Sequence, residues 1–273
     1  MSLNLDVVIN TPDNTVDMKP GLDTLQGASD TTRCIVETVL TGKVPQRQTQ
    51  KSSVRTTLKQ SFSGSYGQRF SIEIHDEGAL DRFEQIGMGV LLELISYFLN
   101  DSVYREPRKL SPGAQDVIDN LGEAVNKLAQ QLRKSPLRNI HEVPVKLGYS
   151  VKIRFRKNKI EQTELAEFNQ ASAQSILAKL SLKSVVLQAS ITRLNINTGN
   201  GRLVPVDGYE TIAFGFDRIY ARVDPEMKVA VSENLNYNNG REPEKWKYID
   251  VVARPLELPD GRVVKYIIKE LRV

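Results

Sequence analysis

The strongest chemical pattern in the sequence is a row of cations within a stretch that is typical of a β-strand. Lys152, Arg154 and Arg156 alternate with apolar residues, and Lys157 and Lys159 follow them. Because side chains alternate between the two faces of a strand, the first three cations are expected on one face, about 6–7 Å apart. Such a row, here called the basic strand, can follow a phosphate backbone. The alternative is a sheet edge whose cations only prevent aggregation.

A second pattern places aromatic residues among cations near the C-terminus. Lys245, Trp246, Lys247 and Tyr248 are consecutive, and Trp246 is the single tryptophan of the chain. Small β-barrels bind single-stranded nucleic acids by stacking bases on aromatic side chains within a basic groove. The alternative is that Trp246 is a core residue of its domain.

A third feature is a window from Thr38 to Ile72 that contains no acidic residue. Its cations are Lys43, Arg47, Lys51, Arg55, Lys59 and Arg69. If the fold brings this window to the basic strand, it extends the same cationic surface.

The two histidines are the first candidates for acid–base chemistry. His75 ends an expected strand beside Asp76 and Glu77, where a His–carboxylate cluster could bind a metal or act as a base. A polar strand end is the favoured interpretation. His141 follows a loop and is expected to be exposed, and neither histidine has a second one at metal-ligand spacing.

A metal-dependent nuclease would need two or three carboxylates and a lysine around strand ends. Two sets flank the first and last expected hairpins, and they are Glu73, Asp76 and Glu77, and Glu257, Asp260 and Lys265. Neither set has a specific spacing. A nuclease is therefore kept only as a second alternative.

The common catalytic and cofactor motifs are absent. The stretch around Thr41, Gly42 and Lys43 lacks the spacing of a phosphate-binding loop, and no dinucleotide fingerprint or Gly-x-Ser-x-Gly elbow occurs. Cys34 is the only cysteine and lies among apolar residues, so it is expected in the core and no disulfide can form within the chain. We therefore predict no catalytic residue, no metal site and no cofactor.

The hydrophobic periodicity predicts helices and strands in the first two thirds of the chain. The expected elements are a strand over 3–9, a helix from Leu22 ending at Gly42, a hairpin over 54–74, a helix over 77–100, a helix over 112–134, and a strand over 149–157. Asn158 and Glu161 then resemble a capping box, which predicts a helix burying residues from Leu165 to Leu180. The helix over 112–134 is expected to pack on its own domain, although a role in binding a partner is the alternative.

After Leu182 short strands replace the long helical periods. The expected strands are 185–196, 202–206, 210–214, 246–253 and 263–271. Residues 224–235 fit a short helix or a strand, and 234–244 is expected to be a polar loop. This spacing is typical of a small barrel of SH3-like or OB-like type.

The sequence thus predicts an α+β protein with an N-terminal mixed helix/sheet domain over 1–182 and a small all-β barrel over 183–273. A net charge of +4 permits nucleic-acid binding without requiring it. The lone cysteine and the lack of a signal peptide or membrane span favour a cytoplasmic protein. The predicted function is a non-catalytic subunit of an intracellular bacterial-type complex, which binds DNA or RNA or serves in assembly. The first alternative is a protein-interaction subunit that makes no contact with nucleic acid.

Overall fold

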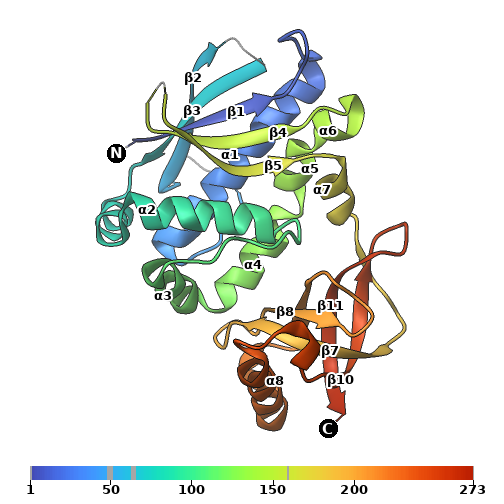
Figure 1. The fold of residues 1–273 in the computed structure, drawn as a ribbon. Helices are drawn as coiled ribbons and strands as arrows, with labels where there is room; N and C mark the ends of the chain where they lie inside the picture. Colours follow the sequence, from blue (N-terminus) through green and yellow to red (C-terminus); the bar gives the residue numbers. More distant parts are fainter. Residues whose placement is uncertain (1, 48–51, 63–65, 159, 273) are drawn as a thin grey trace. The chain divides into compact units, whose positions relative to one another are not determined.

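The computed structural model describes residues 2–47, 52–62, 66–158 and 160–272. The chain divides into two compact units, Met1–Ile176 and Leu177–Val273 (Figure 1). The first combines helices with a sheet and the second holds a small barrel, so the predicted α+β class with a C-terminal barrel is confirmed. The division between the units lies a few residues before the predicted boundary at 182/183.

Five antiparallel strands form the N-terminal sheet in the order β2-β3-β1-β4-β5. They are β1 (Ser2–Ile9), β2 (Val54–Phe62), β3 (Tyr66–Ile74), β4 (Val151–Arg156) and β5 (Gln162–Phe168). The predicted first strand, hairpin and basic strand are confirmed. In β1 the apolar Leu3, Leu5 and Val7 alternate with other residues and lie in the core.

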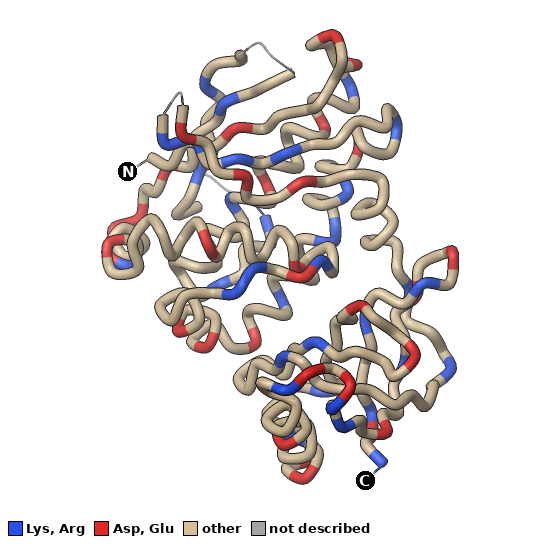
Figure 2. Tube along the Cα trace, viewed as in Figure 1, with Lys and Arg blue, Asp and Glu red and all other residues tan. Residues whose placement is uncertain are grey.

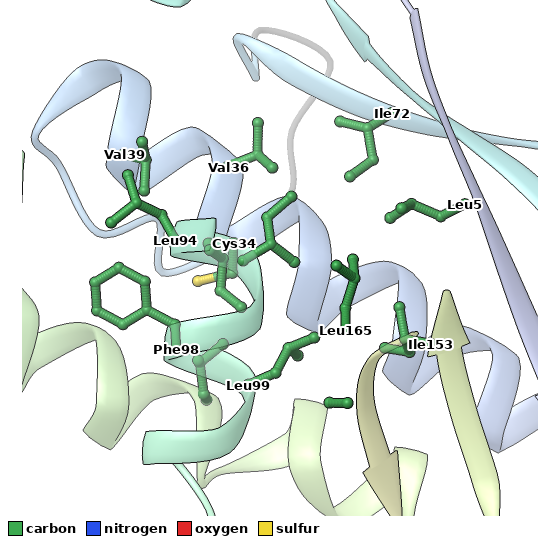
Figure 3. Close-up of a cluster of buried hydrophobic side chains, with 14 of the residues drawn as sticks. Leu5, Cys34, Val36, Val39, Ile72, Leu94, Phe98, Leu99, Ile153 and Leu165 are labelled. Carbon is green, nitrogen blue, oxygen red and sulfur yellow. The ribbon is translucent and has the colours of Figure 1, made fainter. Parts of the chain in front are cut away.

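Seven helices lie in the described residues of this unit. They are α1 (Met18–Thr41), α2 (Glu77–Asp101), α3 (Pro112–Leu121), α4 (Glu123–Leu132), α5 (Ser135–Ile140), α6 (Glu142–Leu147) and α7 (Gln170–Ser175). Figure 3 shows the core, where Leu5, Ile72 and Ile153 from the strands gather with Val36 of α1 and Leu99 of α2.

Helix α1 ends where the sequence predicts. Gly42 adopts a left-handed conformation with φ of 70°, and its N–H donates to the carbonyl of Thr38. Gly27 lowers helix propensity, but packing requires a glycine here. A Cβ at this position would collide with the backbone of Ile140 in α5. The glycine therefore allows α1 and α5 to approach closely.

The next two predicted helices are interrupted at glycines. Helix α2 is kinked at Gly87, whose φ of 77° and ψ of 163° are not helical. The single helix predicted over 112–134 is wrong, because the chain turns at Gly122 and forms α3 and α4 instead. Gly122 has a φ of 51°, a conformation that other residues rarely adopt.

The helix predicted to follow Asn158 is also wrong. The Asn158 side chain accepts hydrogen bonds from the N–H groups of Ile160 and Glu161, but these close a turn between β4 and β5 and do not start a helix. Leu165 and Phe168 are buried as parts of strand β5. Helix α7 begins only after Asn169, whose side chain caps it.

The C-terminal unit is built around a closed five-stranded barrel. Its strands are β7 (Val185–Leu194), β8 (Gly201–Pro205), β9 (Ile212–Phe216), β10 (Ile249–Glu257) and β11 (Val263–Arg272), and β6 (Lys179–Leu180) pairs with β10. Strand β11 closes the barrel because it pairs with β9 in parallel and with β10 in antiparallel. Phe214, Ile191 and Ile268 are fully buried inside.

The barrel unit also carries a helix, so it is not purely β. Residues 224–235, for which helix and strand were both open, belong to α8 (Pro225–Asn238). Asp224 caps this helix, and Val231 buries its side chain in the barrel core. The helix runs into the region predicted as loop over 234–244, which also contains the 3-10 turn η2 (Pro243–Lys245).

No helix in the described part of the chain combines the length and the apolar character needed to cross a membrane. The most apolar stretch of the sequence lies in α2, where Leu94, Ile95 and Phe98 are fully buried in the core.

Candidate nucleic-acid interface

The basic strand is an interior strand of the N-terminal sheet. Strand β4 pairs with β1 on one side and with β5 on the other, so the interpretation of this strand as a protected sheet edge is wrong. The cations of the basic strand lie across from residues of both neighbours, and acidic side chains are available on each.

Asp6 of β1 is the centre of the largest ion-pair cluster among the described residues. Its carboxylate is fully buried, and both of its oxygens accept a bifurcated hydrogen bond from the Nε–H of Arg156, at 2.7 and 2.9 Å. Arg154 and Arg69 flank it, with nitrogen–oxygen distances of 3.8 and 4.0 Å. Arg156 also lies over the ring of Phe62, 4.9 Å from its centroid. The side chain of Arg156 is therefore only 11% exposed.

The two described lysines of the basic strand are paired as well. Lys152 Nζ lies 2.9 Å from Glu164 and 3.9 Å from Glu167, and the hydrogen bond to Glu164 raises the pKa of Lys152. Lys157 Nζ lies 3.0 Å from Glu161 in the turn that follows. Figure 2 shows acidic and basic residues interspersed along these strands. Lys159 lies outside the described residues.

The acid-free window meets the Asp6 cluster through Arg69, and Phe62 of the same window lies under Arg156. Arg69 of β3 lies beside Asp6, as its strand register requires. Lys59 instead forms an ion pair with Glu73, 3.1 Å away. Lys51 falls outside the described residues.

The residues Lys245–Lys247, here called the tryptophan segment, lie between α8 and β10 in the C-terminal unit. Lys245 and Lys247 are exposed, whereas Trp246 is half-buried. The indole N–H of Trp246 donates to the carbonyl of Arg241 at 2.9 Å. The indole is thus held at one edge and still presents part of its ring to solvent.

The backbone of Lys247 is fixed by three polar side chains of the same unit. Its N–H donates to Asn238 Oδ1 at 2.8 Å. Its carbonyl accepts hydrogen bonds from Ser190 Oγ, Asn234 Nδ2 and Asn238 Nδ2, at 2.8 to 3.0 Å. Because the two asparagines and Ser190 are buried, the tryptophan segment is preorganised by the fold.

Tyr237 of α8 completes an aromatic and cationic group beside the tryptophan segment. Lys247 Nζ lies 4.1 Å and the Arg241 guanidinium 4.2 Å from the centroid of the Tyr237 ring. Both distances are within the range of cation–π attraction. Tyr248, the next residue along the chain, is 39% exposed. Glu242 and Glu244 belong to the same loop and are exposed.

The two histidines have different surroundings. His75 is exposed, with Nε2 3.8 Å from Glu73. The prediction that His141 is exposed is wrong, because its side chain is only 1% exposed. Its Nδ1 lies 2.6 Å from the Leu137 carbonyl and its Nε2 lies 2.8 Å from Ser172 Oγ. The carbonyl can only accept, so Nδ1 carries the proton, and the unprotonated Nε2 faces the Ser172 hydroxyl.

Burial lowers the pKa of His141 to about 4, so the ring is neutral at pH 7. Ser172 is 4% exposed, and its hydroxyl is therefore closed to a substrate. The pair connects α7 to α5 and α6, and this is a structural contact. Sequence reasoning missed it because Ser172 lies 31 residues away.

One residue in each carboxylate set considered for a nuclease has a structural role. Asp76 caps α2 by accepting from the N–H of Ala79, and Asp260 is paired with Arg262 at 2.8 Å. No group of three or more metal-binding side chains occurs among the described residues. Cys34 is 3% exposed, and burial raises the pKa of its thiol to about 12, as expected for a core residue.

The helix region 112–134 shows no apolar patch. Its apolar residues Val117, Ile118, Leu128 and Leu132 are buried in the core of the N-terminal unit. This packing agrees with the preferred interpretation of that region, and it leaves no large hydrophobic side chain of α3 or α4 exposed in the described structure.

Comparisons with known proteins give no relative: no family model, no curated protein and no solved structure matches the chain. The assignment of a candidate interface therefore depends only on the positions and contacts of its own residues. The two predicted groups lie in different units, with the basic strand in the first and the tryptophan segment in the second.

Sequence reasoning missed the residues that decide the character of each group. Asp6 is a charged residue between the apolar Leu5 and Val7, and such a position is a signal of a buried ion pair. Asn234 and Asn238 are spaced to share one face of a helix, which is a signal only once α8 is known to be a helix.

Proposed function

We propose that this protein binds single-stranded nucleic acid, without catalysis, through the tryptophan segment of its C-terminal barrel. The observation that carries the proposal is the anchored backbone of Lys247, which fixes a partly exposed indole between two exposed lysines. Bases stack on such rings with little sequence preference, and the lysines attract the phosphates.

The charge of the unit supports this assignment. Residues 177–273 contain 15 Lys and Arg against 12 Asp and Glu, so this unit contributes +3 of the net charge of +4. The exposed lysines of the tryptophan segment make no ion pair in the described structure. Phosphate contacts of this kind release counterions, and binding is therefore expected to weaken as salt rises.

The single tryptophan makes the test direct. Titration with short oligothymidylate, oligoadenylate and a DNA duplex is expected to quench Trp246 fluorescence, more strongly for the single strands. Trp246→Ala, followed by anisotropy of a labelled strand, should weaken binding by about 1–3 kcal/mol, the typical worth of one stacked base. Unchanged fluorescence at saturating oligonucleotide would contradict the proposal.

A matched control exists in the same unit. Lys179 and Lys183 are exposed, and Lys179 pairs across from Glu257, at the opposite end of β10 from Lys247. Lys245→Glu/Lys247→Glu is expected to abolish binding, whereas Lys179→Glu/Lys183→Glu carries the same charge change and is expected to retain most of it. Equal losses would indicate a general charge effect and not a site.

A role in assembly is the second candidate, favoured by a run of exposed apolar side chains at the start of the C-terminal unit. These are Leu177, Leu180, Leu182, Val185 and Val186, and Leu182 is 93% exposed. Exposed clusters of this kind are typical of interaction surfaces. A mass above that of the monomer in sedimentation, lost in Leu182→Glu/Val186→Glu, would support self-assembly. A monomeric mass at every concentration would contradict a role in self-assembly.

A further inference from the structure

A hollow of about 330 Å³ lies in the N-terminal unit between α2, the edge strand β5 and the segment 108–110. Its lining includes Gly89, Leu92, Glu93, Arg108, Lys109 and Leu110. Leu92 and Leu110 are half-buried, and Tyr97 and Leu165 are buried, so the lining combines an apolar wall with charged groups at the mouth.

The acidic and neutral polar groups of this hollow already have partners within the protein. Glu93 accepts a hydrogen bond from the N–H of Ser111 at 2.9 Å, and Glu164 is paired with Lys152. The Leu165 carbonyl accepts from Ser96 Oγ at 2.7 Å. These contacts explain the polar groups of the wall without any ligand.

The two cations that line the hollow differ from these groups because they lack an acidic partner among the described residues. Arg108 and Lys109 are exposed, and neither forms an ion pair with an acid in the part of the chain that the structure describes. A ligand would therefore meet an apolar wall, two adjacent positive charges and the single carboxylate of Glu93, whose charge the N–H of Ser111 does not neutralise. Arginine in particular forms paired hydrogen bonds with carboxylates.

We infer that this hollow binds a small organic anion with an apolar body, of the class of aromatic or medium-chain carboxylates. Its volume is at the lower end of the range of about 300–1,000 Å³ for small-molecule sites. The apolar part would lie against Leu92 and Leu110, with the anionic group at Arg108 and Lys109. The inference is independent of nucleic-acid binding, since every lining residue belongs to the N-terminal unit.

Gly89 allows the hollow to be filled without disturbing the fold. A Cβ built at this position meets no atom within 4 Å, and the residue lies in α2, where glycine is a poor helix former. Gly89→Phe is therefore expected to occupy the hollow at little cost in stability. Gly89→Ala adds one methyl group, leaves most of the volume open and serves as the control.

The test uses 8-anilinonaphthalene-1-sulfonate, an aromatic sulfonate that fluoresces in apolar sites, with decanoate as a competitor. The full chain is expected to bind one equivalent of the dye saturably and to release it to decanoate. Gly89→Phe should remove this binding, and Gly89→Ala should retain it. Arg108→Glu/Lys109→Glu should weaken it at least tenfold, with circular dichroism confirming that each variant is folded.

Two results would overturn the inference. The first is an absence of saturable binding of the dye by the folded wild type. The second is binding that persists unchanged in folded Gly89→Phe, because the dye then occupies another apolar surface. Loss of dye binding in Gly89→Phe with unchanged oligonucleotide affinity would support the hollow and would keep this site distinct from the tryptophan segment.

Discussion

The basic strand and the tryptophan segment have similar sequence signatures and different structural environments. In the basic strand, each described cation lies within 4 Å of a carboxylate oxygen of Asp6, Glu161, Glu164 or Glu167. In the tryptophan segment, the fixed group is the backbone of Lys247, and the lysine side chains remain exposed. The difference shows that a row of cations in a sequence reveals the charges but not whether they are free to bind a ligand. Ion pairing with residues distant in the chain decides that.

The largest expected effect concerns Asp6. Asp6→Asn removes the buried charge that holds Arg156 and leaves three guanidinium groups around a neutral amide. Removing one partner of a buried ion pair typically costs about 3–5 kcal/mol of stability. Urea unfolding should show this loss. Glu164→Gln, in the exposed pair with Lys152, is the matched variant and should lose at most about 1 kcal/mol. Equal losses would contradict a structural role specific to Asp6.

The origin of that prediction also shows what the sequence could and could not reveal. Local patterns predicted α1 with its end at Gly42, the hairpin of β2 and β3, and the strands of the barrel, since each depends on neighbouring residues. The contact of Asp6 with Arg156 joins residues 150 positions apart, and no local pattern contains it. The helix expected after Asn158 failed because the same cap chemistry also closes a strand turn.

The N-terminal unit holds both histidines of the chain, and the buried one should make it sensitive to acid. His141 is neutral in the folded state, with its pKa near 4 against about 6.5 when unfolded, so protonation favours the unfolded chain. The contribution of His141 to the free energy of unfolding is fully present above pH 6.5 and is lost as the pH falls through 4. Between pH 7 and pH 5 the loss should be about 2 kcal/mol.

The measurement is urea unfolding at several pH values, followed by circular dichroism. His141→Gln, which cannot titrate, should have lower stability at pH 7 and should lack this part of the pH dependence. If the two proteins lose stability in parallel between pH 7 and pH 5, the buried histidine is not the cause.

A smaller effect should follow from loosening the tryptophan segment. Asn238→Ala removes one hydrogen bond to the N–H and one to the carbonyl of Lys247, leaving those from Ser190 and Asn234 to the carbonyl, and it should cost about 1–2 kcal/mol of stability. A shift of Trp246 emission to longer wavelength should accompany it as the indole becomes more exposed. Asn239→Ala, at the exposed neighbouring position, should change neither quantity. An unshifted emission in Asn238→Ala would show that other contacts fix the indole.

The smallest effect is expected at the exposed end of the basic strand. Lys157→Ala breaks only a solvent-exposed pair with Glu161, so stability should change by no more than about 0.5 kcal/mol. Oligonucleotide affinity should change less than twofold, because this lysine already has an acidic neighbour. A loss of affinity comparable to that of Trp246→Ala would show that the basic strand takes part in binding the oligonucleotide.

The most direct test compares the two groups in one experiment. Anisotropy of a labelled single strand would be measured across a salt series for the wild type, for Lys152→Glu/Lys157→Glu and for Lys245→Glu/Lys247→Glu. Our account predicts salt-sensitive binding by the wild type, a change of less than threefold in the first variant, and loss of at least tenfold in the second. Retained binding in Lys245→Glu/Lys247→Glu, with loss in Lys152→Glu/Lys157→Glu, would contradict the account and assign the interface to the basic strand.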